Sequence, residues 1–546
     1  MKRDSAKILT IILSSLLFLS ACKQNTVLTE QTVANESFGG IAFDPMIRTS
    51  KASVALSDTS EATGSYHHTT STEAPESAPN EETSVSETTA AATAPSINTT
   101  TAAPTQTETT SRSAETTTAR TTTERTTAPA TSETERTTAI TATTTTTPGL
   151  TEPETLSQPS VTTAAAWTGS YPKNSYQAIN YQEMKGVWIS YLEIATLLKG
   201  KNETDFRRAA AEIYDNCLSL GINTVFVHAR AFGDAFYFSD LFPFTKHLSG
   251  SIGVKTAYDP YPILIDEAHK RGISFHAWIN PLRLCGTSDL IAVSSEFPIK
   301  KWYSDSSLKG NYLVEVNGSW YLNPAYPEAI RLAGDGVREI VSRYDVDGVH
   351  IDDYFYPTTD ASFDRAAYAA SDASSLSAFR IGNCNELVRE IYRAVHECSD
   401  SAVFGASTQG NMSNNLNQLY ADAEAWCKGG YVDYFAPQIY YGFENSAQPF
   451  KRCTDEWNAL VRGTSTRLCI GLAVYKIGAE DQWAGEGKYE WQNTDTMLRR
   501  QIEYAKEGKN YGGIALYSYN YLFTEGYRTA AIQKEIENFK PILTND

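Results

Sequence analysis

The feature that most restricts the fold of this chain is a regular alternation of short apolar segments with amphipathic segments between about residues 185 and 541. Several of the short segments are apolar almost throughout, as at 224–227. Continuous apolar runs of this length are typical of parallel strands that are covered on both faces. We therefore predict strands at 186–190, 224–229, 274–280, 348–353, 403–408, 434–440, 468–475 and 513–519.

The segments between these strands carry apolar residues at helical spacing. Ile330, Ala333, Val337 and Ile340, for example, fall on one face of a helix. Eight strands that alternate with eight helices predict an α/β fold, a (β/α)8 or TIM barrel at 181–541. The predicted helices are 205–220, 261–271, 327–344, 376–397, 415–427, 450–461, 495–507 and 528–539.

The alternative to a barrel is an open, doubly wound sheet. That fold usually has fewer repeats and a glycine-rich phosphate turn after its first strand. Here Tyr191, Leu192 and Glu193 follow the first predicted strand, and no such turn is present there. The barrel is therefore the favoured prediction.

The N-terminal segment 1–22 is predicted to be a lipoprotein signal peptide. Three basic residues precede an apolar stretch at 8–19, which is short for a membrane span. The tetrapeptide at 19–22 ends in Cys22 and resembles a bacterial lipobox. We expect cleavage before Cys22 and lipid attachment to its sulfur, which predicts a membrane lipoprotein on the outside of the cytoplasm. The alternative is an ordinary signal peptide that contains a cysteine.

The segment 23–180 is predicted to be a disordered linker. From about residue 50 to residue 166 it consists largely of Thr, Ser, Ala, Glu and Pro, with almost no large apolar residues. Such a chain cannot bury enough apolar area to offset the entropy lost on ordering. We expect an extended stalk that gives the tethered barrel reach, and the sequence leaves open whether the stalk is O-glycosylated.

Charge and cysteine content restrict the partners. A net charge of −18 argues against a nucleic-acid partner, because phosphate binding needs a basic face. Seven of the eight cysteines follow Cys22, and their spacing contains no CxxC pair. A zinc site is therefore not expected, most of these cysteines are expected to be small buried hydrophobes, and no cofactor is predicted. His276 and His350 are alternative metal ligands, but hydrogen bonding to substrate or to each other is the favoured prediction.

Polar or aromatic residues occur at the ends of all eight predicted strands. In barrels of this kind the active site lies at the C-terminal ends of the strands, so these residues are the candidates for function. A separate insertion carries Trp302, Trp320 and Tyr321, which form either a sugar subsite or a local minicore. The candidates at the strand ends include Glu193, Arg230, Asp234, Trp278, Asn280, His350, Asp352, Asp353, Gln409, Gln438, Tyr440, Tyr475 and Tyr517.

The fourth predicted strand carries the strongest signal. Because side chains alternate across a strand, Val349 and Ile351 should face the helices, and His350 and Asp352 should face the barrel axis. Asp353 follows on the turn. Glycosidases use one carboxylate at the cationic sugar centre and a second acid to protonate the leaving oxygen. The pair therefore predicts acid–base chemistry, unless Asp353 only caps the next turn.

Several segments together resemble glycosyl-hydrolase-like family 10, a group of exported bacterial barrels related to glycosidases. The most specific is DGVHIDDYFYP at 347–357. The resemblance implies hydrolysis of glycans, with cell-wall glycan strands as the linked substrate class, and it assigns the active-site role to Asp352 and Asp353. The other matching segments are KGVW at 185–188, GDAFY at 233–237, HAWINP at 276–281, WYLNPA at 320–325 and APQIY at 436–440.

The segment after the fifth strand departs from the family pattern. Residues 407–411 read STQGN, whereas related glycosidase barrels often place a Glu acid there. The proton donor is therefore open, with Asp353, Asp234 and Glu193 as candidates in that order. Asp234 either reaches over the barrel mouth or only stabilises a loop turn.

The favoured hypothesis is a lipid-anchored glycoside hydrolase that acts on peptidoglycan or another surface polysaccharide. In it Asp352 is the nucleophile or cation stabiliser, and Asp353 or Asp234 is the acid. The alternative is a non-catalytic glycan-binding protein on a degenerate barrel. A third hypothesis, that the protein is an adhesin or a structural spacer, accounts for the stalk but not for the polar strand ends. The expected substrate-binding residues are His350, Asn280, Arg230, Gln438 and Glu193, with Trp278 and Tyr440 as stacking surfaces.

Overall fold

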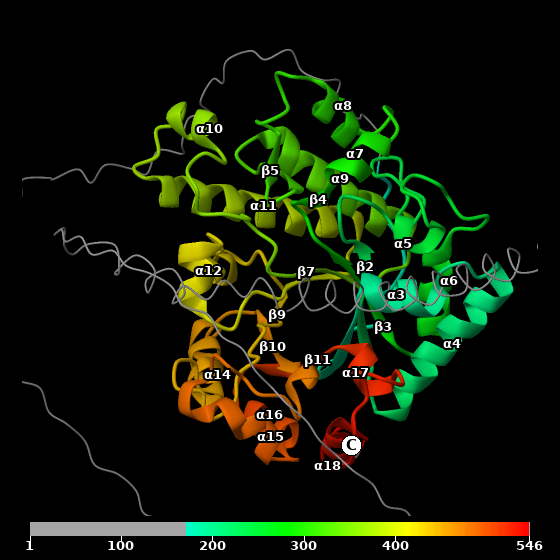
Figure 1. The fold of residues 1–546 in the computed structure, drawn as a ribbon, viewed down its shortest axis with the longest axis vertical. Coiled ribbons are helices and arrows are strands. Elements are labelled where there is room, and N and C mark those ends of the chain that lie inside the picture. The colour runs from blue at the N-terminus through cyan, green and yellow to red at the C-terminus, as the bar shows by residue number, and fades with distance from the viewer. Residues whose placement is uncertain (1–170, 545–546) are drawn as a thin grey trace, which may run out of the picture. The chain divides into compact units, whose positions relative to one another are not determined.

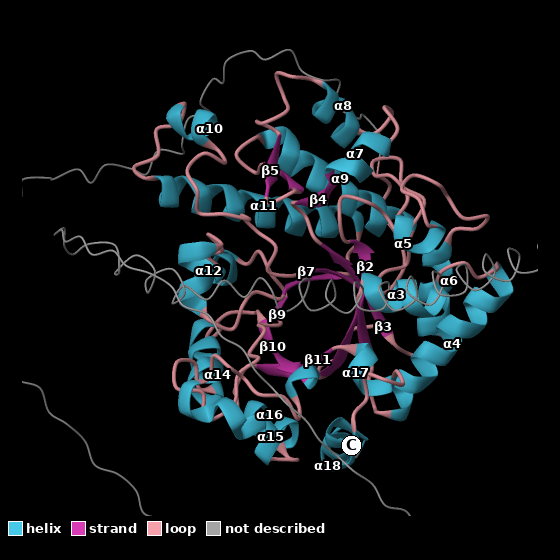
Figure 2. Ribbon diagram, viewed as in Figure 1, coloured by secondary structure: helices cyan, strands magenta, loops and turns pink. Residues whose placement is uncertain are grey.

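In the computed structural model the structure describes residues 171–544, and these fold into a closed parallel barrel with helices around it (Figures 1 and 2). The predicted TIM barrel is confirmed. The signal peptide with Cys22 and most of the predicted linker lie outside the described residues. In order around the barrel, the strands are β1 (Met184–Ile189), β2 (Thr224–Arg230), β3 (Ser274–Ile279), β7 (Gly348–Ile351), β8 (Val403–Ala406), β9 (Tyr434–Phe435), β10 (Arg467–Ala473) and β11 (Tyr511–Tyr517).

Helices connect consecutive strands and cover the outside of the barrel, as Figure 2 shows. The helices that follow the eight strands in turn are α4 (Glu203–Ser219), α6 (Pro260–His269), α9 (Pro327–Arg343), α11 (Leu376–Cys398), α13 (Ala423–Gly429), α14 (Phe450–Leu460), α16 (Met497–Lys506) and α18 (Ala530–Thr544). Shorter helices lie in the loops: α3 (Tyr191–Leu198), α5 (Lys246–Ser249), α7 (Thr287–Ala292), α8 (Pro298–Ser304), α10 (Arg365–Ala369), α12 (Met412–Gln418), α15 (Glu490–Asn493) and α17 (Tyr519–Phe523), with 3-10 turns η1 (Val474–Lys476) and η2 (Gly485–Tyr489).

Strand alternation divides the core into an outer layer and an inner layer. Val349 and Ile351 pack in the outer layer between strands and helices, as predicted from their spacing. The inner layer fills the barrel axis with residues of the opposite parity, including Trp188, Phe226 and Trp278. Both layers are buried, so every barrel strand contributes apolar area on two faces.

Tyr434 occupies the centre of the barrel between two histidines. His276 Nδ1 and His350 Nδ1 lie 2.8 and 2.9 Å from its hydroxyl, and Trp188 Nε1 donates to His350 Nε2 at 3.1 Å. Gly405 makes room for the ring, since a Cβ there would lie 2.0 Å from it. Both histidines therefore have protein partners within the barrel, and burial lowers the pKa of each.

The segment 171–183 runs across the N-terminal ends of the strands. Asp347, directly before β7, accepts hydrogen bonds from Tyr176 Oη at 2.9 Å and from Phe275 N at 2.6 Å, and Ile179 N also donates to it. Asn174 N donates to Cys398 O at 2.7 Å. Residues 171–180, which we assigned to the linker, therefore belong to the folded unit. The linker prediction extended too far because this segment is polar and is held by hydrogen bonds, which periodicity does not reveal.

An insertion after β3 forms a small antiparallel sheet of β4 (Arg283–Gly286), β6 (Ser319–Leu322) and β5 (Leu313–Val316). Trp302 packs edge-on against Tyr312, and Trp320 packs edge-on against Tyr303, so both tryptophans belong to a minicore. Tyr321 differs, because it also lines the cavity described below. Trp302 and Trp320 therefore fit the minicore alternative, whereas Tyr321 is placed where it could contribute to a sugar subsite.

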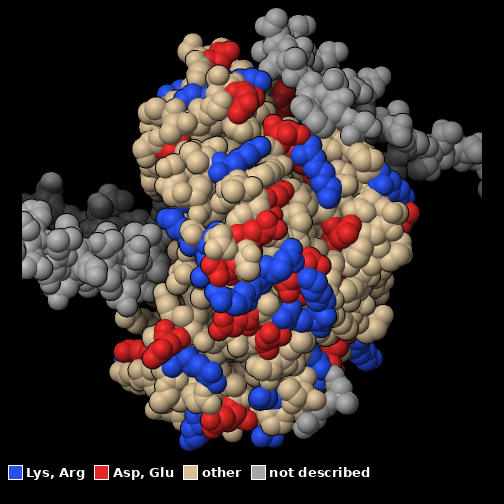
Figure 3. Space-filling view, turned by 90° about the vertical axis from the view of Figure 1, so that its right-hand side faces the viewer, with Lys and Arg blue, Asp and Glu red and all other residues tan. Residues whose placement is uncertain are grey.

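The described surface mixes charges of both signs on the side of α4 and α6 (Figure 3). Arg271 pairs with Asp215 at 2.7 Å, and Arg207 and Lys270 both pair with Glu267 at 2.9 Å. The seven cysteines of the described part are all buried, as expected for most of them, and they are unpaired. No helix in the described part is long and apolar enough to cross a membrane.

Candidate active site

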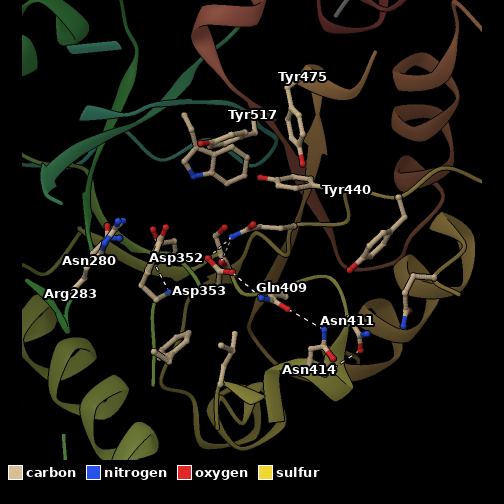
Figure 4. Close-up of a pocket in the computed structure, with 18 of the residues that line it drawn as sticks. Asn280, Arg283, Asp352, Asp353, Gln409, Asn411, Asn414, Tyr440, Tyr475 and Tyr517 are labelled. Carbon is tan, nitrogen blue, oxygen red and sulfur yellow. Dashed lines mark hydrogen bonds between the residues drawn. The ribbon is translucent and has the colours of Figure 1, made fainter. Parts of the chain in front are cut away.

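A cavity of about 350 Å³ opens at the C-terminal ends of the barrel strands. Asp352 and Asp353 follow β7 directly and lie at its centre (Figure 4). Six of the ten sequence candidates for catalysis or substrate binding line this cavity. These six are Asp352, Asp353, Trp278, Asn280, Gln438 and Tyr440.

Asp352 is the more deeply buried of the two carboxylates, with 4% of its surface exposed. Its Oδ2 accepts from Trp278 Nε1 at 3.0 Å, and its Oδ1 accepts from Tyr354 N at 3.1 Å. Trp278 reaches it from the neighbouring strand β3. The inward orientation predicted by strand alternation is thus observed, and two donors fix the carboxyl group in place.

Asp353 is half-buried, and two glutamine side chains hold it. Gln409 Nε2 donates to Oδ2 and Gln438 Nε2 donates to Oδ1, each at 3.2 Å. Gln438 is itself fixed by Ser407 O at 3.1 Å, and Gln409 lies within 3.5 Å of Asn414 Nδ2. Gln438, which we expected to bind substrate hydroxyls, therefore positions Asp353.

The two carboxyl groups differ in their affinity for a proton. Burial, with a smaller contribution from the neighbouring Asp353, raises the pKa of Asp352 to about 8. Burial also raises the pKa of Asp353, but the amide donors of Gln409 and Gln438 oppose that effect. Because Asp353 is more exposed and has two side-chain donors, Asp352 is the group that keeps its proton near neutral pH.

This difference predicts a pH dependence of folding stability. Between about pH 4 and pH 8 folded Asp352 holds a proton that the unfolded chain has lost, so stability should fall as the pH rises through that window. We expect the Asp352→Asn variant to melt above wild type at pH 9 and at about the same temperature near pH 4. Thermal unfolding monitored by circular dichroism tests this prediction. It is contradicted if the melting temperature of wild type rises relative to that of Asp352→Asn as the pH increases.

His228 fixes the orientation of Asn280 at the cavity wall. Tyr191 N donates to His228 Nδ1 at 3.1 Å, so the ring proton lies on Nε2, which contacts Asn280 Oδ1 at 3.0 Å. Burial keeps the pKa of His228 well below its ordinary value, and the ring stacks on Trp278 with centroids 3.4 Å apart. The Asn280 amide nitrogen is therefore left as the donor available to a ligand.

Tyrosines form one wall of the cavity. The rings of Tyr440, Tyr475 and Tyr517 form a triangle with centroids 5.9 to 6.0 Å apart, and Figure 4 shows the three rings together. Burial raises the pKa of all three, so their hydroxyls stay neutral. Trp483 lies at the rim with 58% of its surface exposed. Aromatic faces with polar edges suit sugar rings, which have apolar faces and hydroxyl edges.

Arg230 lies outside the cavity, contrary to prediction. Strict alternation with His228 would direct it inward, but the pairing of β2 with β3 shifts register between these two residues. The bulge reverses the alternation, so Arg230 lies over the ring of Phe242, 4.3 Å from its centroid, and near Gly336 of α9.

Three further candidates also lie outside the cavity lining. Glu193 caps α3, accepting from Ser190 N at 2.9 Å and from Ser518 Oγ at 2.6 Å. Asp234 closes a turn by accepting from Phe232 N at 2.9 Å. His350 lies below the cavity in the inner layer described above. Of the three acid candidates, only Asp353 lies at the site.

Several charged or amide residues that line the cavity had no role in the prediction from sequence, among them Gln409, Lys476, Asp481 and Arg283. Gln409 was noted only at a strand end, although it holds Asp353. Lys476 and Asp481 pair at 2.8 Å, and Arg283 stands beside Asn280. Its place in the sequence could have indicated Arg283 as a site residue, because it follows the end of the third predicted strand and the Pro281 turn. Among residues 171–544 no cluster of three His, Cys, Asp or Glu residues is arranged to hold a metal.

Comparison with known proteins places the chain in a family. The family model for Glycosyl hydrolase-like 10 matches residues 183–485, more than half of the chain, so the chain belongs to this family. Glycosyl hydrolase YngK of Bacillus subtilis (strain 168) is 33% identical over 351 residues, covering 60% of this chain and 67% of the relative. Glycosyl hydrolase DigH of Escherichia coli (strain K12) is 29% identical over 391 residues, covering 65% and 87%.

Among solved structures, the glycoside hydrolase domain of PgaB (BpsB) from Bordetella bronchiseptica is similar to this chain, with 12% identity and a TM-score of 0.42. The likeness covers 65% of this chain and 99% of that domain. The family assignment rests on the family model and on the curated relatives. It supports a glycosidase-type function for the chain.

Proposed function

We propose that this protein is a lipid-anchored glycoside hydrolase outside the cytoplasm that cleaves peptidoglycan or another surface polysaccharide. The observation that carries the proposal is the carboxyl pair, in which Asp352, whose pKa burial raises to about 8, lies beside the more exposed Asp353 in a cavity walled by tyrosines. Two carboxyl groups with separated proton affinities are what acid-assisted cleavage of a glycosidic bond requires.

In the proposed reaction the roles of the pair are the reverse of our expectation from sequence. Asp352 donates its proton to the glycosidic oxygen as the bond to the anomeric carbon breaks. Asp353, positioned by the hydrogen bonds that Gln409 and Gln438 donate to it, acts as the carboxylate that stabilises or attacks the cationic anomeric carbon. Water then supplies the hydroxyl of the new reducing end, and its remaining proton returns to Asp352. Asn280 and Tyr440 contact the sugar.

An assay of reducing ends tests this proposal. Full-length wild type should release reducing ends from purified peptidoglycan or from one of a panel of surface polysaccharides, and the Asp352→Asn variant should not. The second candidate, a non-catalytic glycan-binding protein, is favoured by Gln409, which stands near where related barrels often carry a Glu acid. Tight glycan binding without any release by wild type would support that candidate instead.

The membrane anchor is a separate part of the proposal and has its own test. The lipobox ending in Cys22 motivates it. We expect wild type in the membrane fraction of expressing cells and the Cys22→Ala variant in the soluble fraction, because the variant lacks the sulfur that accepts the lipid. Metabolic labelling with a fatty acid provides the direct readout. A Cys22→Ala protein that is still labelled and membrane-bound contradicts the anchor.

A further inference from the structure

Asn415 is a buried polar residue that lies behind the wall of the cavity. It belongs to α12, has 1% of its surface exposed and is not among the residues that line the cavity. Its side-chain oxygen accepts from Gln409 N at 3.0 Å, and its side-chain nitrogen donates to Gln409 O at 2.8 Å. A primary amide carries a donor and an acceptor side by side, and Asn415 uses one of each on the main chain of a single residue.

This pair of hydrogen bonds takes the place of a strand that has ended. Ser407 N donates to Ile351 O at 2.7 Å at the end of β7, after which the chain turns into the cavity with the carboxyl pair. Gln409 follows Ser407 by two residues, so in an extended chain its N–H and C=O point to the same edge. Buried main-chain groups need partners, and Asn415 provides them where β7 no longer does.

The opposite edge of this segment is held by Gln438. Gln438 N donates to Thr408 O at 2.8 Å, and Gly410 N donates to Gln438 O at 3.1 Å. The main chain around Gln409 is therefore bonded on both edges. Its side chain points into the cavity, where Nε2 donates to Asp353 Oδ2 at 3.2 Å (Figure 4).

From this arrangement we propose that Asn415 is a positioning residue for the cleavage reaction, because by holding the main chain of Gln409 it orients the donor that holds Asp353. Asn415 does not line the cavity, so its effect is transmitted by Gln409. A carboxylate that stabilises or attacks the anomeric carbon must stay aligned with it, and a displacement of about 1 Å can cost on the order of 100-fold in rate. The proposal rests on the proposed glycan cleavage and deepens it, since it adds a residue outside the cavity to the site.

The kinetic test compares full-length wild type with Asn415→Leu, which has a similar shape but neither donor nor acceptor. We expect kcat for a cleaved glycan to fall about 10- to 100-fold while KM stays within about threefold. Gln409→Leu should lose a similar amount, and adding Asn415→Leu to it should lower kcat by less than about threefold further, because the two residues act in series. Asn417→Leu is the matched control, since Asn417 lies on the same helix but is exposed and donates to Ser413 Oγ at 3.1 Å.

A second measurement does not need cleavage. In the Asp352→Asn background, the pH dependence of carbodiimide labelling of Asp353, located by mass spectrometry, follows the protonation of that carboxyl group. Burial raises the pKa of Asp353 and the hydrogen bond from Gln409 opposes that rise, so Asn415→Leu should move the labelling midpoint to higher pH. The other charged and titratable groups around Asp353 are the same in both proteins, and these are Arg283, Tyr354, Tyr440 and Tyr441.

An unshifted labelling midpoint in Asn415→Leu overturns the proposal, as does a loss of kcat that adds in full to that of Gln409→Leu. A lower melting temperature with unchanged kcat and midpoint also overturns it, because that result shows a structural role alone. If Asn415→Leu fails to fold, Asn415→Ala, which removes the same two groups but leaves room for water, takes its place in both measurements. If wild type cleaves no glycan, the hydrolase proposal fails, whereas the labelling midpoint still decides whether Asn415 positions the donor to Asp353.

Discussion

Replacing Asp352 by Asn should lower the turnover of a natural glycan by about 1,000-fold while the barrel stays folded. General-acid catalysis contributes about 100- to 10,000-fold, and Asn cannot donate a proton to the leaving oxygen. The side-chain shape is nearly unchanged, and the Asn oxygen can still accept one of the two hydrogen bonds that Trp278 Nε1 and Tyr354 N donate to Asp352. Initial rates of reducing-end release, with melting temperatures as the folding control, provide the measurement.

The leaving group distinguishes the acid from its partner. An aryl glycoside whose phenol departs without protonation should be cleaved by Asp352→Asn far better than the natural glycan, whereas Asp353→Asn should lose both substrates. Asp234→Asn is the matched control, since Asp234 closes a turn outside the cavity and Asn can accept the same hydrogen bond. Unchanged turnover in Asp352→Asn, or a large loss in Asp234→Asn alone, contradicts the assignment.

Replacing Arg380 by Met should destabilise the protein by about 3–5 kcal/mol, the cost of leaving the partner of a buried ion pair uncompensated. Arg380 and Asp364 are both fully buried and bond at 2.7 and 2.8 Å. Arg380 also donates to Thr358 O and Asp360 O at 3.1 and 2.7 Å. It therefore holds the loop after β7 that carries the cavity residues 354–357.

Urea unfolding measures this loss, and Arg499→Met provides the control. Arg499 pairs with Glu503 at 3.0 Å, but both side chains are about half exposed, so this variant should lose less than about 1 kcal/mol. We also expect Arg380→Met to raise KM for glycan, because the loop wall of the cavity loosens. A loss similar to that of the control, with unchanged KM, contradicts the role of the buried pair.

Much of the fold could be predicted because the signal repeats. All eight predicted strands overlap observed strands, since a parallel barrel strand buries both faces and reads as an apolar run. Asp352 was predictable for the same reason, because period-two alternation at Val349 and Ile351 fixes its direction. The ends of the strands were less predictable. For example, β9 is only Tyr434–Phe435, while the chain beyond it continues as isolated bridges such as Gln409 to Gln438.

The rest of the site depended on features that a single sequence does not show. Arg230 was assigned to the cavity because it stands at the end of the second predicted strand, but a bulge between His228 and Arg230 directs its side chain away from the cavity. Gln409 and Gln438 act by holding Asp353, which depends on a contact between residues 56 and 85 positions away from it. The position of Arg283 depends on the insertion after β3, because the small sheet of this insertion is not part of the barrel repeat.

The most direct test of the account is cleavage in water enriched in oxygen-18, followed by mass spectrometry of the products. Hydrolysis at the anomeric carbon should place one heavy oxygen on each new reducing end formed by wild type, and Asp352→Asn should form almost no labelled product. Products without label, or binding of the glycan with no new reducing ends, contradict the central claim that Asp352 and Asp353 cleave glycosidic bonds with water.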